Sequence, residues 1–163
     1  VSCPVFVDIN IRQPHFSFKL FEPLLFNVDH LKLNDDELKY LTEQSTVAAA
    51  TASYESRESL SRIARELKAK YKIKNLWLTA GSRGAAWIGP SGQYLRVNAP
   101  QVNNLVDAVG AGDALAAVII RSILAGQPAK DALPLAVAYA ARVCTLRGAI
   151  TRDTSFYRPE SMA

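Results

Sequence analysis

The stretch VDAVGAGDALAA, residues 106–117, carries the strongest local signal in the chain. Gly110 and Gly112 have no side chain, so the backbone can come close to a ligand there. The apolar run 114–124 predicts a helix, and the N–H groups and dipole at its start favour an anion such as phosphate. Asp113 could accept a proton from a hydroxyl group while those N–H groups hold developing negative charge. A glycine turn with an aspartate N-cap is the alternative interpretation.

Two other glycine-rich motifs do not fit this stretch. A Walker A loop needs Gly-x-x-x-x-Gly-Lys-Ser/Thr, and the chain has no such run. A dinucleotide fingerprint needs a third glycine, and Leu115 occupies that position. An NAD-binding α/β domain therefore remains only a distant alternative.

The rest of the chain predicts strands that alternate with helices. Apolar runs at 5–9, 30–33 and 75–80 predict strands, and helical spacing or caps predict helices at 18–27, from 35 onward, at 55–71 and at 129–146. Segments 85–88 and 94–97 flank Gly-Pro-Ser-Gly and predict a hairpin, whereas 44–53 is expected to be a helix end plus loop. This order predicts an α/β fold with a mostly parallel sheet and a small antiparallel hairpin.

Composition excludes several classes of protein. The chain has 163 residues, 49% hydrophobic, with a net charge of +4, which predicts one globular domain rather than disorder. No apolar run reaches the ~18 residues that a membrane span needs, so we expect a soluble protein. Two cysteines favour a reducing cytoplasm over a disulfide framework. Basic residues in 55–74 alternate with acidic ones, which predicts a solvated helix face and no nucleic-acid partner.

The histidines are expected at the surface or at strand ends, and the tryptophans are expected to be structural. His15 and His30 lack metal-ligand spacing, and Trp77 and Trp87 are expected to pack in the core or hairpin.

Five segments together resemble the ribokinase-like, PfkB-type carbohydrate kinases. They are DINIR (8–12), KLNDDE (32–37), LTAGSRG (78–84), VDAVGAGD (106–113) and CTLRGA (144–149). Only the Gly-Ala-Gly-Asp segment is specific by itself, but all five occur in the family's order. The resemblance implies a three-layer α/β/α ribokinase-like fold, of which this chain would hold the C-terminal half.

The resemblance also implies a role for the glycine segment and for the loop before it. Asp113 would activate the sugar hydroxyl, and Gly110, Ala111 and Gly112 would form the anion hole for the transferred phosphoryl group. Asp107 would help to bind a monovalent cation such as K⁺, although a simple loop carboxylate is the alternative.

Further residues would bind the nucleotide and substrate. Asn34 and Glu37 would lie near the ATP phosphates and organise Mg²⁺ through water, with a plain capping box as the alternative. Arg12 would face the substrate or the phosphates, or would pair with Asp8 or a loop carbonyl. Residues bordering the nucleotide, or else forming an ordinary strand-to-hairpin turn, would be Thr79, Gly81 and Gly84.

The chain departs from the family pattern in three respects. Ala108 replaces a common threonine, and Val137 replaces a common asparagine. The chain begins at Val1 directly before an apparent buried strand, so we expect sequence to precede it. Residues 1–163 would then be the nucleotide-binding half of one kinase domain, lacking the lid and the sugar site and inactive or very weak alone.

The expected activity is ATP-dependent phosphorylation of a sugar hydroxyl by a cytoplasmic enzyme. A fructokinase is the first expectation, a 2-keto-3-deoxygluconate kinase the second, and a ribose or nucleoside kinase the third. A non-catalytic module that binds ATP is the alternative of a different class. The exact sugar and whether the intact protein forms a homodimer stay open.

Overall fold

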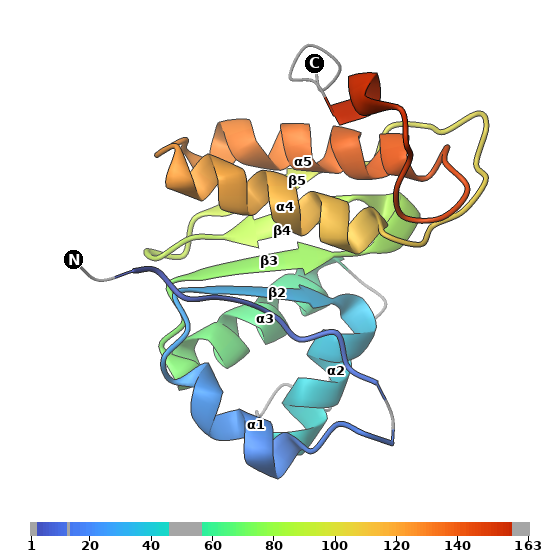
Figure 1. The fold of residues 1–163 in the computed structure, drawn as a ribbon. Coiled ribbons are helices and arrows are strands. Elements are labelled where there is room, and N and C mark those ends of the chain that lie inside the picture. The colour runs from blue at the N-terminus through green and yellow to red at the C-terminus, as the bar shows by residue number, and fades with distance from the viewer. Residues whose placement is uncertain (1–2, 13, 46–56, 158–163) are drawn as a thin grey trace. The chain divides into compact units, whose positions relative to one another are not determined.

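The computed structural model describes residues 3–12, 14–45 and 57–157. Most of the predicted loop 44–53 lies outside these residues. The helices and strands follow the predicted order (Figure 1): β1 (Phe6–Asp8), α1 (Phe18–Leu25), β2 (His30–Asn34), α2 (Asp35–Gln44), α3 (Arg57–Tyr71), β3 (Asn75–Thr79), η2 (Gly81–Arg83), β4 (Ala85–Ile88), β5 (Tyr94–Val97), α4 (Ala111–Leu124), α5 (Ala129–Val143) and η3 (Thr154–Tyr157).

The strands form one sheet in the order β1-β2-β3-β4-β5. The pairs β1–β2 and β2–β3 are parallel, with Asn34 opposite Thr79 in the register. The short turn between β4 and β5 requires an antiparallel pair, because parallel neighbours need a long crossover. The predicted hairpin is therefore present. Only five residues join β3 to β4, so this pair is antiparallel too, and the sheet is mixed, with β1, β2 and β3 parallel. Because parallel strands end at the same edge, Asp8, Asn34 and Thr79 all stand at the edge where α/β proteins bind ligands.

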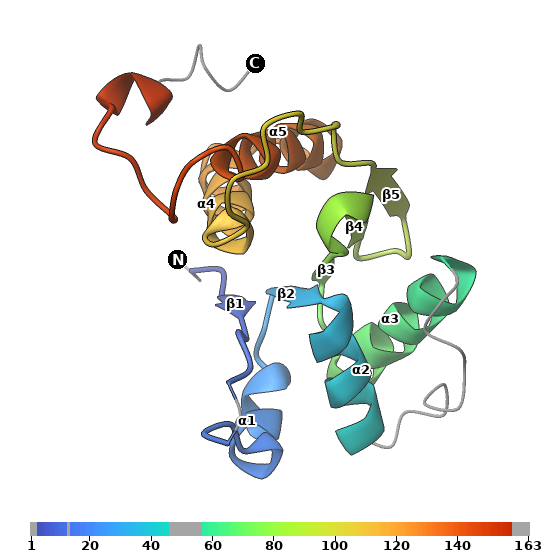
Figure 2. The same cartoon turned by 90° about the vertical axis from the view of Figure 1, so that its right-hand side faces the viewer.

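The chain divides into two compact units, 1–80 with 87–95 and 81–86 with 96–163. In the first unit, α1, α2 and α3 lie on one side of β2 and β3 (Figures 1 and 2). Leu31 and Leu33 of β2 are fully buried on this side, as are Ile63 and Leu67 of α3. These residues belong to one apolar core cluster, which holds the helices against the strands.

Each of the strands β1, β2, β3 and β4 contributes one aromatic side chain to a row of rings across the sheet. Successive ring pairs along this row are Phe6–His30, His30–Trp77 and Trp77–Trp87, with centroids 6.1–6.5 Å apart. Burial lowers the pKa of His30, which favours the neutral imidazole between its neighbours. The predicted packing role of both tryptophans is confirmed, although β1 is only half-buried rather than buried as expected.

The second unit is built around the helix pair α4 and α5. Buried residues of the pair are Leu115, Ala116, Val118, Ile119, Ala132, Leu133, Ala136, Val137 and Val143. Phe156 of η3 packs on Tyr139, with ring centroids 5.8 Å apart. The expectation that residues 114–124 are buried all round is wrong, because Ile120 and Leu124 are 38% and 76% exposed. No helix of the described residues is long and apolar enough to cross a membrane.

Candidate functional site

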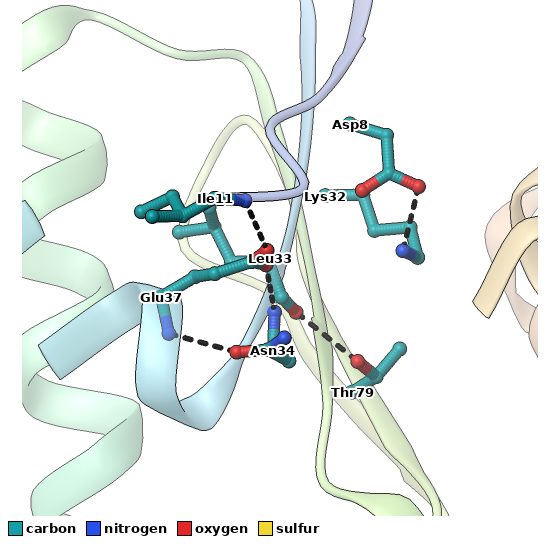
Figure 3. Close-up of polar contacts among 7 residues, drawn as sticks. All are labelled: Asp8, Ile11, Lys32, Leu33, Asn34, Glu37 and Thr79. Carbon is teal, nitrogen blue, oxygen red and sulfur yellow. Dashed lines mark hydrogen bonds and ion pairs between the residues drawn. The ribbon is translucent and has the colours of Figure 1, made fainter. Parts of the chain in front are cut away.

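The N-terminus of α2 is closed by a reciprocal cap at the carboxyl end of β2. The Asn34 side chain accepts from the Glu37 N–H at 2.7 Å, and Glu37 Oε2 accepts from the Asn34 N–H at 2.8 Å (Figure 3). Asp35 and Asp36 add negative charge to the first turn, which stabilises the positive end of the helix dipole. The predicted capping box is therefore present.

Glu37 also binds a second segment of the chain. Its Oε1 atom accepts from the N–H of Ile11, which lies in the loop after β1, at 3.1 Å (Figure 3). Glu37 is only 8% exposed, so these backbone donors compensate a carboxylate that has lost most of its water.

An ion pair joins β1 to β2 at the same edge. Lys32 Nζ lies 2.7 Å from Asp8 Oδ2, and Lys32 is 6% exposed (Figure 3). The alternative of an Arg12–Asp8 ion pair is not observed, because the Asp8 partner among the described residues is Lys32. Arg12 is exposed, and within the described part of the chain its guanidinium has no salt-bridge partner.

The third strand of this edge ends in the predicted nucleotide-side segment. The Thr79 hydroxyl donates to the Leu33 carbonyl at 3.3 Å (Figure 3). The Gly84 N–H donates to the Gly81 carbonyl, closing the turn between β3 and β4. Gly84 has a φ of +89°, and a Cβ there would lie 2.0 Å from the Val97 carbonyl oxygen, so only glycine fits. The turn alternative thus describes the geometry, and the nucleotide role stays a prediction.

In the second unit, the start of α4 is fixed by close packing. Gly110 precedes the helix with a φ of +83°, and a Cβ on it would lie 2.5 Å from the Ala149 Cβ. The Ala111 N–H donates to the Ala108 carbonyl at 3.2 Å. Helix geometry leaves the N–H groups of Gly112 and Asp113 without a carbonyl one turn earlier. The exposed Asp113 side chain stands at the third position of this helix.

Asp107 ties the loop before α4 to the segment after α5. Its two oxygens accept from the N–H groups of Val109 at 3.0 Å and Gly148 at 3.2 Å. The N–H of Asp107 itself donates to the Cys144 carbonyl. Burial, and then the negative charge of Asp107, raise the pKa of the Cys144 thiol, so this cysteine is a poor nucleophile.

Sequence reasoning missed the long-range partners of these residues. It assigned no contact to Lys32 or Ile11 and no packing to Ala149. Lys32 within the apolar run HLKL was a usable signal, because a lysine buried in a strand needs a paired charge. Nothing local pointed to Ile11 or Ala149. Ile11 lies 26 positions before Glu37, and Ala149 lies 39 positions after Gly110, by the difference of 149 and 110.

These features define a class of protein. In the first unit, parallel strands end in polar side chains. In the second unit, α4 begins with Gly-Ala-Gly-Asp, and each of these features by itself suits phosphate groups. The family model of the pfkB carbohydrate kinases matches residues 2–155, so the chain belongs to that family. This assignment replaces the distant NAD-binding alternative.

The relatives agree with this assignment. The chain is 31% identical over 104 residues to a 1-phosphofructokinase from Haemophilus influenzae, covering 64% of this chain and 33% of that protein. It is similar to ribokinase from Arabidopsis thaliana in complex with ribose and ATP, with a TM-score of 0.74 and 24% identity, covering 90% of this chain and 43% of that one. A 2-dehydro-3-deoxygluconokinase from Thermotoga maritima has a TM-score of 0.71 and 22% identity, covering 91% and 47%.

Two conclusions follow from the comparisons. The expected ribokinase-like fold is confirmed, because these structural likenesses cover nine tenths of the chain. The chain spans less than half the length of these relatives, so the activity of the whole protein is a matter for proposal.

Proposed function

We propose that the protein containing this chain transfers the γ-phosphoryl group of ATP to a sugar hydroxyl. The observation that carries this proposal is the position of Asp113. Its exposed carboxylate stands in the first turn of α4, and the contact of Gly110 with Ala149 holds that turn in place. A base beside free N–H groups is the arrangement that phosphoryl transfer needs.

The reaction then proceeds through these groups. Asp113 accepts the proton of the sugar hydroxyl as its oxygen forms a bond to the γ-phosphorus. The bond from that phosphorus to the bridging oxygen breaks, and ADP leaves with the electron pair. The segment Gly110, Ala111 and Gly112 brings backbone N–H groups to the charge that develops on the phosphoryl oxygens. Because Ala111 already donates to Ala108, the N–H groups of Gly112 and Asp113 contribute most.

ATP and Mg²⁺ are assigned to the carboxyl ends of β2 and β3 and to the segments that follow these strands. Asn34, Glu37, Thr79, Gly81 and Gly84 would line the nucleotide, and Glu37 would hold Mg²⁺ through water. Each Glu37 oxygen accepts one N–H bond, so a second lone pair remains for a water molecule. This set fits Mg²⁺, which keeps several waters and takes phosphates as ligands, and which neutralises phosphate charge when bound. The described residues contain no cluster of three acidic, histidine or cysteine side chains for a direct metal site.

A monovalent cation such as K⁺ and the substrate contact of Arg12 complete the proposal. Asp107 is the only residue we assign to the cation, and it shares its oxygens with Val109 and Gly148. Arg12 would bind an anionic or hydroxyl-rich part of the acceptor, which its exposed planar guanidinium suits.

A fructokinase-like acceptor is our first choice, because the DINIR segment and its following Pro14 and Phe16 most resemble that group. The test measures ADP formation from ATP and Mg²⁺ with fructose, fructose 1-phosphate, 2-keto-3-deoxygluconate, ribose and a nucleoside. We expect one sugar to raise ADP formation well above the rate without an acceptor. The absence of any acceptor-dependent ADP would contradict the proposal.

A module that binds ATP without a sugar site is the second candidate. The observation that favours it is that Asn34 and Thr79, both assigned to ATP, stand at one edge of the sheet and need no sugar to bind a nucleotide. Turnover of the full-length protein separates the two, since the module binds ATP but no sugar and forms no acceptor-dependent ADP. For either candidate, the two free cysteines favour a cytoplasmic location. Sedimentation of the intact protein would show whether it forms a homodimer.

A further inference from the structure

Glu37 forms one more bond than the cap of α2 requires. In the capping box, the Glu37 side chain needs only one bond, the one that its Oε2 atom accepts from the Asn34 N–H. The bond from Ile11 to Oε1 therefore serves another purpose, and it links a loop to a helix 26 positions later in the chain. Because Glu37 is 8% exposed, water competes little for this bond.

The loop has an unusual backbone just before this bond. Asn10 has a φ of +50°, in the left-handed region that residues other than glycine rarely adopt. Asparagine tolerates this conformation best, and the surrounding contacts must hold it there. The turn at Asn10 directly precedes the N–H that Glu37 accepts. Arg12 follows Ile11 directly, and its carbonyl accepts from the His15 N–H at 2.9 Å.

We propose that Glu37 is a positioning residue, whose buried carboxylate fixes the loop after β1 and so holds Arg12 at the carboxyl edge of the sheet for an anionic substrate group. This inference rests on the proposed function. The bond to Ile11 is the step that transmits the position of α2 to the loop. Glu37 thus serves the acceptor side of the reaction, in addition to its proposed water-mediated contact with Mg²⁺.

Only a carboxylate can make both bonds. Its two oxygens accept from two N–H groups, and the negative charge strengthens each bond. In Glu37→Gln the single amide oxygen can replace one acceptor, and the amide NH₂ then faces the other N–H. We expect this variant to lose the bond from Ile11, which at 3.1 Å is the longer of the two, and to keep the local cap bond at 2.8 Å. Asp36→Asn is the matched control, because it removes the same charge from the same helical turn at an exposed residue that makes no contact with the loop.

The first measurement is hydrogen exchange of the Ile11 amide in the full-length protein. In Glu37→Gln we expect exchange to become at least about tenfold faster, since a bond to a charged acceptor is lost. Asp36→Asn should exchange as the wild type does. Equal exchange in the two variants would overturn the proposal.

The second measurement is steady-state kinetics with the acceptor that supports turnover. Glu37→Gln should raise the KM for the acceptor about tenfold, with a smaller change in the KM for ATP. In an Arg12→Ala background the same substitution should raise the acceptor KM no further, because Glu37 acts through Arg12. Additive effects of the two substitutions, or a change confined to the Mg²⁺ dependence, would contradict the positioning role.

A second variant protects the test against misfolding. Asn10→Val strains the left-handed residue and leaves the cap of α2 intact, so it should reproduce both effects, whereas Asn10→Gly should retain slow exchange at Ile11. If no acceptor supports turnover in the wild type, the proposed function fails. The exchange measurements then decide by themselves whether Glu37 fixes the loop.

Discussion

Gly110 shows how a single residue fixes the start of α4. Two independent constraints apply to it, a φ of +83° and the contact with Ala149, and no other residue type satisfies both. The glycine pattern alone predicted that the backbone can come close to a ligand there. The structure adds that Gly110 also lies against Ala149, so that no side chain fits between them.

Gly110→Ala is expected to destabilise the protein by about 2–4 kcal/mol, from the strained φ and the overlap with Ala149. Gly126→Ala is the matched control, because Gly126 has a φ of +68° with open space around it. The control should lose only about 1 kcal/mol. Urea unfolding of both variants measures the difference. Equal losses would show that the contact with Ala149 costs nothing.

At the residue scale the sequence predicts types of side chain better than their partners. Asn34 and Glu37 are three positions apart, so their cap was predictable. Ile11 and Gly148 contribute backbone N–H groups to carboxylates far along the chain. Every residue carries such a group, so no pattern of side chains singles these two out.

Among the elements, α2 depends on Asn34, the residue that caps its N-terminus. Asn34→Ala removes the acceptor for the Glu37 N–H and should cost about 1 kcal/mol of stability. Ser17 occupies the same position before α1 but makes no side-chain cap bond. Ser17→Ala should therefore be nearly neutral. Thermal unfolding of the two variants tests this, and an equal effect would show that the cap of α2 is not stabilising.

The start of β1 is held by Asp29, which precedes β2. The bonds from Lys74 at 2.7 Å and from the Val5 N–H at 2.9 Å lower the pKa of Asp29. A lowered pKa in the folded state gives stability that is present above the unfolded pKa of about 3.9 and is lost as pH falls through the folded value. The acid dependence of stability should therefore weaken when these bonds are removed.

Asp29→Asn should lose less stability than the wild type between pH 6 and pH 3. Lys74→Gln should lie between the two, because it removes the larger cause and leaves the Val5 bond. Chemical unfolding at several pH values gives the three curves. Identical slopes for all three proteins would refute the assigned cause.

Element types were predictable from periodicity, but some boundaries and the extent of burial were not. Residues 129–146 read as one helix, yet α5 ends at Val143, with a tight turn after it. The apolar run of α4 suggested burial on all sides, but Ile120 and Leu124 remain exposed. Composition states which side chains are apolar, whereas the packing of neighbouring elements decides which of them are covered.

For the whole molecule, the order of the five segments along the chain predicted the family, and the match over residues 2–155 confirms it. Order along the chain was informative because strands in an α/β fold follow one another with helices between them. The acceptor sugar was not predictable in the same way. Substrate choice depends on side chains gathered from distant segments, and this chain spans less than half the length of these relatives.

The most direct test of the account concerns Asp113 in the intact kinase. Acceptor-dependent ADP formation is compared between Asp113→Asn and Asp131→Asn, since each aspartate is exposed at the third position of its helix, α4 or α5. The account predicts that Asp113→Asn lowers kcat by about 10²–10⁴-fold while Asp131→Asn stays near the wild type. Normal turnover by Asp113→Asn with the accepted sugar would contradict the assignment of Asp113 as the base.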